Sequence, residues 1–249
     1  VFDLVFIKDI RDLMKHLPRK RQTLFFSSTI NEKIKKLAYS LVNNAIRIQI
    51  SPKDPVAKNI DHAVAFISMD DKRFFLEELI KNNQDAKMLV FVRTKVRAER
   101  VKKAMDRVGV VAETIHSDKD QKEREQTMYD FRYGNLKILI ATDVSARGID
   151  IPNVDYVVNY DLPETMEYYV HRVGRTGRAK NKGNAVTFCS DDEQEQLNAI
   201  EKRLGKPIKR IDISKYEYQT TVKTSGGLDN WQSLVEELDS HKSKRKKKK

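Results

Sequence analysis

The feature that most constrains the fold is a regular alternation of short apolar runs with amphipathic segments from about residue 60 onward. The apolar runs are nearly continuous, which is typical of strands that are covered on both faces of a sheet. The amphipathic segments place their apolar residues with helical periodicity. Five or six strand–helix repeats with short connections predict an α/β fold, a doubly wound parallel sheet flanked by helices. The expected strands are 62–68, 87–92, 110–116, 137–142, 154–160 and 184–190.

Local signals indicate where several helices begin and end. A helix should start near Thr94, and the helix that follows residue 120 should be closed by Gly134. Ser190 and Glu193 have the spacing of a capping box, in which each residue satisfies a free N–H of the other. The helix that they start should stop at Gly205, because glycine readily adopts the left-handed conformation that ends helices.

The chain divides into four expected parts. Residues 1–49 contain two helical segments and one strand-like run, "QTLFFSST", and resemble the end of a preceding α/β unit. Residues 50–57 include two prolines and are expected to form a linker. The main domain should cover residues 58–213. Residues 214–249 form a C-terminal extension that ends in a basic tail.

Charge and cysteine content limit the classes of function. The net charge is +12, and the terminal "KSKRKKKK" (242–249) carries seven of the positive charges. Such a block usually stays disordered, as a solvated tail or as a loose tether for RNA or DNA. Cys189 is the only cysteine, and the five histidines lack metal-ligand spacing, so we expect no disulfide and no metal site. No apolar run has membrane-spanning length. These features predict a cytoplasmic protein without membrane contact.

The stretch "HRVGRTGR" (171–178) concentrates three arginines and two glycines. Arginine stays charged and presents a planar fork that matches phosphate or carboxylate oxygens. Glycine allows the backbone to approach a ligand closely. This combination indicates a phosphate site, and only Val173 is expected to be buried.

A second candidate loop, "ATDVSARGID" (141–150), leaves the strand-like run 137–142. Ligands of open parallel sheets bind at the carboxyl ends of the strands. Thr142 could donate its hydroxyl to a phosphate, Gly148 could offer its N–H, and Asp150 could accept a sugar hydroxyl. The alternative is a surface loop with an Arg147–Asp150 ion pair, which contributes about 0–1 kcal/mol to stability.

Several long motifs together resemble one family, the DEAD-box RNA helicases. The resemblance implies a RecA-like fold for the main domain and ATP-dependent unwinding of RNA. It covers about residues 1–213, with 1–49 as the end of a first RecA-like domain. The motifs are "RQTLFFSST" (21–29), "MLVFVRTK" (88–95), "IHSDKDQKERE" (115–125), "ATDVSARGIDI" (141–151), "NYDLP" (159–163) and "YVHRVGRTGRAKNKG" (169–183).

In this family ATP lies in a cleft between two RecA-like domains and is held mainly by the first. The resemblance implies that Arg175 and Arg178 are arginine fingers that reach the γ-phosphate, and that His171 acts beside them. It implies that Gly148 and Asp150 contact phosphate and ribose. ATP and Mg²⁺ are therefore the expected cofactors, with Mg²⁺ bound mainly by the N-terminal domain.

The resemblance also implies contacts to the RNA backbone, which position a strand but carry little sequence information. The expected RNA-binding residues are Arg93, Thr94, Ser117, Arg124, Thr142 and Arg147. The expected interdomain coupling residues are Ser27, Thr29, Gln121 and Asp143, with His171 linking the cleft to Ser27 and Thr29.

Some positions depart from the family pattern. Ser28 stands where the family has alanine, and Ser117 stands where it has glycine. The sequence contains neither a G-x-x-x-x-G-K-[ST] phosphate loop nor an Asp-Glu-Ala-Asp run. We therefore expect a fragment of a longer helicase, inactive alone, whose partners are RNA and the N-terminal RecA-like domain of the same protein. The alternatives are a non-catalytic RNA-binding module and a DNA helicase or translocase of the same superfamily.

Overall fold

The computed structural model of the chain divides into two compact units. The smaller unit comprises Val1–Pro55 and Arg147–Asp150, and the larger unit comprises Val56–Ala146 and Ile151–Lys249. The structure describes residues 7–18, 20–26, 32–42, 44–48, 55–146, 154–177 and 181–224. The domain boundaries expected from the sequence stay a prediction.

The smaller unit contains two helices, α1 (Ile7–Lys15) and α2 (Glu32–Leu41). The strand expected at 22–29 is not formed in its described part, because residues 21–26 are neither helix nor strand. The apolar side chains of Leu24 and Phe26 are 67% and 84% exposed. A strand needs a hydrogen-bonded neighbour, and the described residues of this unit contain no other strand. An apolar run alone was therefore an insufficient signal.

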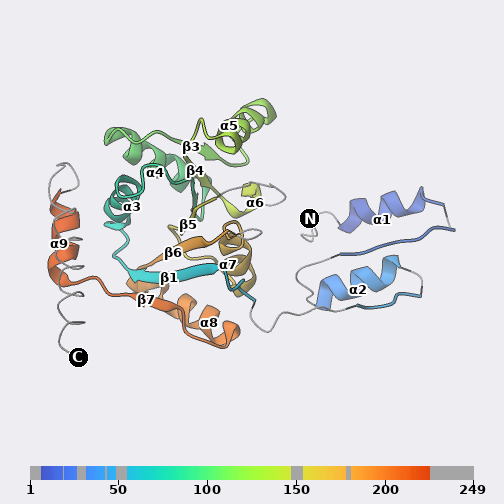
Figure 1. The fold of residues 1–249 in the computed structure, drawn as a ribbon. Helices are drawn as coiled ribbons and strands as arrows, with labels where there is room; N and C mark the ends of the chain where they lie inside the picture. Colours follow the sequence, from blue (N-terminus) through green and yellow to red (C-terminus); the bar gives the residue numbers. More distant parts are fainter. Residues whose placement is uncertain are drawn as a thin grey trace. The chain divides into compact units, whose positions relative to one another are not determined.

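The larger unit is built on a seven-stranded sheet with the order β3-β4-β2-β5-β6-β1-β7. Every strand pair in it is parallel, which confirms the predicted fold class. The first strand of the unit, β1, lies between the last two (Figure 1). The strands are β1 (Ile60–Phe66), β2 (Met88–Phe91), β3 (Ala112–Ile115), β4 (Ile138–Ala141), β5 (Tyr156–Asn159), β6 (Gly183–Cys189) and β7 (Lys209–Ile211). The sequence did not predict β7, whose three residues are exposed and include two basic side chains.

Helices connect the strands, and the predicted caps are confirmed. Thr94 is the N-cap of α4, where its hydroxyl accepts the Arg97 N–H at 3.1 Å. Gly134 and Gly205 end their helices with φ of 87° and 74°. The helices are α3 (Lys72–Lys81), α4 (Lys95–Arg107), α5 (Gln121–Tyr133), α6 (Asp143–Ala146), α7 (Met166–Val173), the 3₁₀ turn η2 (Asp191–Glu193), α8 (Gln194–Leu204) and α9 (Lys215–Thr224).

The core lies on both faces of the sheet. Met88 and Val90 belong to a buried cluster that includes side chains of α3 and α4. Leu89 and Phe91 alternate with them, so they point to the opposite face, and both are also buried. On that face the guanidinium carbon of Arg172, from α7, lies 5.1 Å from the centre of the Phe91 ring. The sheet is therefore covered on both sides, as its continuous apolar strands predict.

The C-terminal extension begins with a packed helix. Tyr218 of α9 donates its hydroxyl to the Asp71 carboxylate at 2.7 Å, and its ring contacts Phe75 of α3 at 5.0 Å between ring centres. Thr221 donates to Glu78 of α3 at 2.7 Å. In Figure 1, α9 runs alongside α3. The described part of the extension is thus attached to the domain.

The turn that follows α7 is packed tightly against the start of β6. A Cβ atom on Gly183 would overlap the backbone nitrogen of Gly177 and the hydroxyl of Thr176. Gly177 has φ of 62°, a conformation that side chains disfavour. Both glycines are therefore required for the path of residues 174–177.

We expect Gly183→Ala to lower the free energy of unfolding by about 2–3 kcal/mol, because the new methyl group overlaps backbone rather than a flexible side chain. Lys182→Ala, at the exposed neighbouring position, should change it by less than about 0.5 kcal/mol. Urea denaturation of both variants measures the difference. Equal stabilities would contradict the tight packing of this turn.

Candidate functional site

The ends of three neighbouring strands bring together most of the predicted RNA-binding residues. Phe91 of β2 pairs with Ala141 of β4, which in turn pairs with Ile115 of β3. The residues that follow these strand ends therefore lie at one edge of the sheet. They are Arg93 and Thr94 after β2, Ser117 after β3, and Thr142 and Asp143 after β4.

Arg93 is held on two sides. Its backbone N–H donates to Asp161 Oδ2 at 2.9 Å, and its Nη2 donates to Glu193 Oε1 at 3.2 Å. The side chain nevertheless remains 47% exposed. Thr94 uses its hydroxyl oxygen as the N-cap acceptor, so its own O–H proton can still be donated. Both residues can thus offer donors to an anion at this edge.

The first turn of α5 carries Arg124. The turn is fixed by a capping box, in which Asp120 Oδ1 accepts the Glu123 N–H at 2.7 Å. Gln121 donates to Glu125 at 2.6 Å within the same helix. The buried Nε of Arg124 has no hydrogen-bond partner within the described residues. An unsatisfied buried donor costs about 1–3 kcal/mol, so this atom favours an acceptor that arrives from outside the chain.

A carboxylate fixes the end of β3 beside Ser117. Glu99 of α4 accepts the Thr114 hydroxyl at 2.6 Å and lies 2.8 Å from His116 Nε2. The hydrogen bond from Thr114 is the main cause that lowers the pKa of Glu99 below its ordinary value. Ser117 itself is exposed, with its hydroxyl 3.4 Å from Asp118. The loop that carries Ser117 is therefore anchored on the side of α4.

Arg172 is a buried charged residue at the candidate site that the sequence analysis did not single out. Its Nε and Nη2 donate to the two carboxylate oxygens of Asp143, both at 2.7 Å, and its Nη1 donates to the Asp161 carbonyl at 2.7 Å. The residue is only 2% exposed. The expectation that Val173 alone would be buried in this stretch is wrong. The position of Arg172, three residues after the buried Tyr169 on the inner face of α7, was the signal that could have found it.

The turn after α7 carries Arg175. Thr176 is 1% exposed and donates its hydroxyl to the Asp155 carbonyl at 3.1 Å, and the Asn59 amide donates to the Gly177 carbonyl. Asp155 precedes β5 and Asn59 precedes β1, so this turn is anchored at the amino ends of strands. The loops that leave the strands lie at the opposite edge of the sheet, and the role of Arg175 stays a prediction.

The structure does not describe every predicted site residue. His171 lies in the last turn of α7 and is half-buried. The hydroxyl oxygen of Thr142 lies 3.0 Å from the hydroxyl oxygen of Ser145. The remaining candidates lie outside the described residues: Ser27, Thr29, Arg147, Gly148, Asp150 and Arg178.

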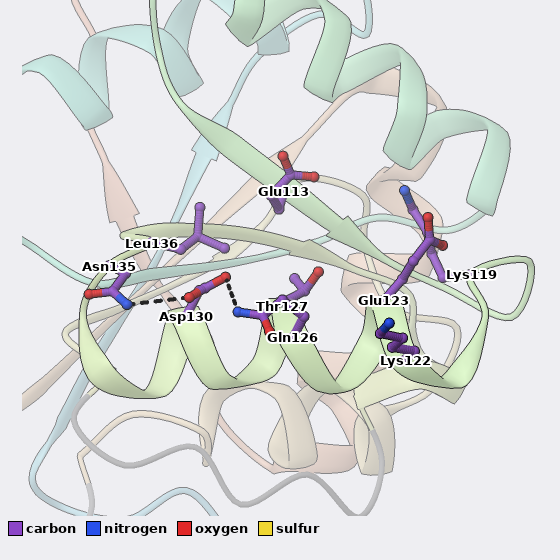
Figure 2. A pocket seen from close by; sticks show the side chains of 9 residues that line it. All are labelled: Glu113, Lys119, Lys122, Glu123, Gln126, Thr127, Asp130, Asn135 and Leu136. Atoms are coloured by element: carbon purple, nitrogen blue, oxygen red, sulfur yellow. Dashed lines mark hydrogen bonds between the residues drawn. The ribbon is translucent and has the colours of Figure 1, made fainter.

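A hollow of about 640 Å³ lies between β3 and α5, beside the predicted RNA contacts. Figure 2 shows Glu113 on the strand facing the helix, and Asp130 bonded to Gln126 and Asn135. The lining includes Lys119 and Lys122 but also three carboxylates, which disfavour a phosphate. Over the described ranges, no group of three or more His, Cys, Asp or Glu residues is placed to hold a metal ion. None of the described helices is both long and apolar enough to cross a membrane.

Comparisons with known proteins bear on the same residues. Residues 71–180 match the family described as the helicase conserved C-terminal domain. The chain is 36% identical over 217 residues to the ATP-dependent RNA helicase DbpA of Bacillus subtilis, covering 87% of this chain and 45% of that protein. It spans about half the length of the curated relatives that it matches.

Solved structures show the same similarity. The C-terminal domain of the DEAD-box protein Dbp5 matches with a TM-score of 0.58 and 33% identity, covering 70% of this chain and 99% of that one. S. cerevisiae Dbp5 bound to RNA and ADP BeF3 matches with a TM-score of 0.75 and 31% identity, covering 88% of this chain and 58% of that one.

We expect Asp143→Asn to lower the free energy of unfolding by about 2–4 kcal/mol, because it leaves the buried Arg172 guanidinium without its counter-charge. Asp118→Asn removes one partner of the half-exposed Lys95–Asp118 pair, and it should lower the free energy of unfolding by less than about 1 kcal/mol. Thermal and urea unfolding of the two variants compare them. Similar losses of stability in the two variants would show that the Arg172–Asp143 pair contributes no more to stability than a surface ion pair.

Proposed function

The chain belongs to the DEAD-box family of ATP-dependent RNA helicases, and on that premise we propose that it supplies one of the two lobes that close on ATP and RNA. The other lobe is an N-terminal RecA-like domain of the same protein. The described residues offer an anchored arginine turn for the nucleotide and a row of donors for the RNA. ATP-driven closure of the two lobes would then separate the strands of an RNA duplex locally.

On the nucleotide side, Arg175 and Arg178 act as arginine fingers, assisted by His171. The anchoring of the turn through Thr176 and Gly177 supports this role, because a preorganised cation loses little freedom when a phosphate arrives. Gly148 and Asp150 contact the phosphate and the ribose. ATP is held together with Mg²⁺, which the N-terminal domain binds.

On the RNA side, Arg93, Thr94, Ser117, Arg124 and Thr142 bind successive phosphates of one strand. Two features of Arg93 and Arg124 support this assignment. Arg93 is charged and half-exposed at the strand edge, and Arg124 has an unsatisfied buried donor. S. cerevisiae Dbp5, a similar structure, was solved with RNA and a nucleotide together. Arg147, which lies outside the described residues, is assigned to RNA in the same proposal.

The observation that carries the proposal is the buried Arg172–Asp143 pair, which connects the two sides. Arg172 lies three residues before Arg175, and Asp143 directly follows Thr142. A bidentate pair tolerates little displacement, so the finger turn and the RNA-binding loop after β4 must move together. ATP and RNA would then favour the same closed state. Gln121, Ser27 and Thr29 complete the coupling between lobes.

We expect Arg175→Ala in the full-length protein to lower kcat for ATP hydrolysis by about 10³–10⁵-fold, since an arginine finger stabilises charge only in the transition state. The RNA Kd should stay within about threefold of the wild-type value, because this turn is anchored away from the strand ends that face RNA. RNA-stimulated ATPase assays and RNA titrations measure the two quantities. The exposed Arg107, replaced by alanine, is the matched control. Equal losses of kcat and RNA affinity would assign Arg175 to RNA instead.

We expect the 249-residue chain alone to show no RNA-stimulated ATP hydrolysis, because its sequence lacks the phosphate loop and the acidic motif that hold ATP and Mg²⁺. A phosphate-release assay with and without RNA tests this. Turnover by the isolated chain would contradict the two-lobe proposal. A full-length protein without ATPase activity would favour a non-catalytic RNA-binding module, and stimulation by DNA rather than RNA would favour a DNA translocase.

A further inference from the structure

A buried carboxylate lies directly behind Arg93. Glu193, at the end of η2, is 3% exposed and accepts hydrogen bonds from four residues of the domain. Its Oε2 accepts from Lys72 Nζ and from the Ser190 N–H and hydroxyl, the last two at 3.1 Å. Its Oε1 accepts from Arg93 Nη2 and the Leu162 N–H, both at 3.2 Å. One carboxylate thus ties together the loops after β2, β5 and β6.

Glu193 is kept ionised at this place. Burial alone raises the pKa of its carboxyl, but the charge and hydrogen bond of Lys72, together with the backbone N–H groups of Ser190 and Leu162, bring the pKa below its ordinary value. Lys72 is itself 0% exposed, and the two side chains form an ion pair inside the domain. Buried ion pairs of this kind seldom stabilise a fold more than apolar residues would. Stability alone therefore does not explain why this ion pair is buried here.

The geometry of Arg93 gives that reason. Arginine carries five N–H donors on a flexible stem, and this freedom is lost when it binds a ligand. In Arg93 one nitrogen is bonded to Glu193 and the backbone N–H is bonded to Asp161, while about half of the side chain is exposed. The guanidinium is thus oriented before any ligand arrives, with donors left for it.

We propose that Glu193 is a positioning residue for RNA, which holds the Arg93 guanidinium in the orientation that meets a backbone phosphate. Lys72 fixes the Glu193 carboxylate in turn. This inference rests on the proposed contact between Arg93 and RNA. Preorganisation of this kind raises affinity by reducing the loss of side-chain freedom on binding.

Positioning and simple electrostatics predict opposite signs for the same substitution. Glu193→Gln removes a negative charge near the RNA-binding edge, so attraction between charges alone would tighten RNA binding. If Glu193 orients Arg93, the same substitution weakens binding although the site has become more positive. The sign of the change therefore separates the two explanations.

The experiment measures the Kd of a fluorescent single-stranded oligouridine for the full-length protein with a non-hydrolysable ATP analogue. We expect Glu193→Gln to raise this Kd by about 3–10-fold, which corresponds to the loss of one oriented contact. The RNA concentration for half-maximal ATPase should rise while kcat at saturating RNA stays unchanged. Glu195→Gln is the matched control, because it makes the same charge change at an exposed position of α8. Its Kd should be unchanged or lower.

A double-mutant cycle shows whether Glu193 acts through Arg93. In the Arg93→Ala background, Glu193→Gln should no longer weaken RNA binding. If Arg93→Ala alone leaves the Kd unchanged, the proposed RNA contact itself is wrong. If Arg93→Ala weakens binding and Glu193→Gln does not, the contact stands and the positioning role is overturned.

Because Glu193→Gln leaves Lys72 without its partner, the variant is compared with Lys72→Met/Glu193→Gln, in which the buried site is neutral. A merely structural role would lower the melting temperature and leave the Kd of the folded protein unchanged. The positioning role predicts the same rise in Kd in both variants. It also predicts that the slope of log Kd against the logarithm of the salt concentration falls by about 0.7, the value for one single-strand phosphate contact.

Discussion

The arrangement of the domain depends on the hydrogen bonds of the Arg172 guanidinium, which is buried among the ends of β4 and β5. A charged group withdrawn from water must be paired and hydrogen-bonded. Arg172 meets this requirement through Asp143, the Asp161 carbonyl and the Asn159 side chain. Each of these partners lies at or just after the end of a strand. The position of α7 over the sheet is therefore tied to the loops that surround the strand ends.

Much of the fold could be predicted because its signals are local. Six strands are marked by apolar runs, and local residues set several helix ends: Thr94 begins α4, and Gly134 and Gly205 end α5 and α8. Signals that depend on a distant partner were misread. The apolar run at 22–29 lacks a strand neighbour within the described residues, whereas β7, with its basic residues, becomes a strand because β1 offers it a free edge. In both cases the presence of a neighbouring strand, rather than the composition of the segment, determined whether a strand formed.

The candidate site shows the same limit. Motif resemblance singled out Arg93 and Arg124 as candidates, because the motifs that contain them can be read in a short window of sequence. The residues that hold Arg93 are far apart along the chain: Lys72 and Glu193 are 121 residues apart, and Arg93 and Glu193 are 100 residues apart. No local pattern shows that a glutamate in an ordinary capping position also accepts a buried lysine. Only the folded sheet brings these side chains together.

The position of β1 in the sheet has a consequence for the order of assembly on the ribosome. β1 is the first strand of the domain to emerge, yet its neighbours β6 and β7 are synthesised last. Contacts between distant parts of a chain form late because closing a long loop is entropically unfavourable. The Asn59–Gly177 bond spans 118 residues. A nascent chain can therefore complete strands β2 to β5 while the turn that carries Arg175 is still unformed, so that this turn folds only together with the last strands of the sheet.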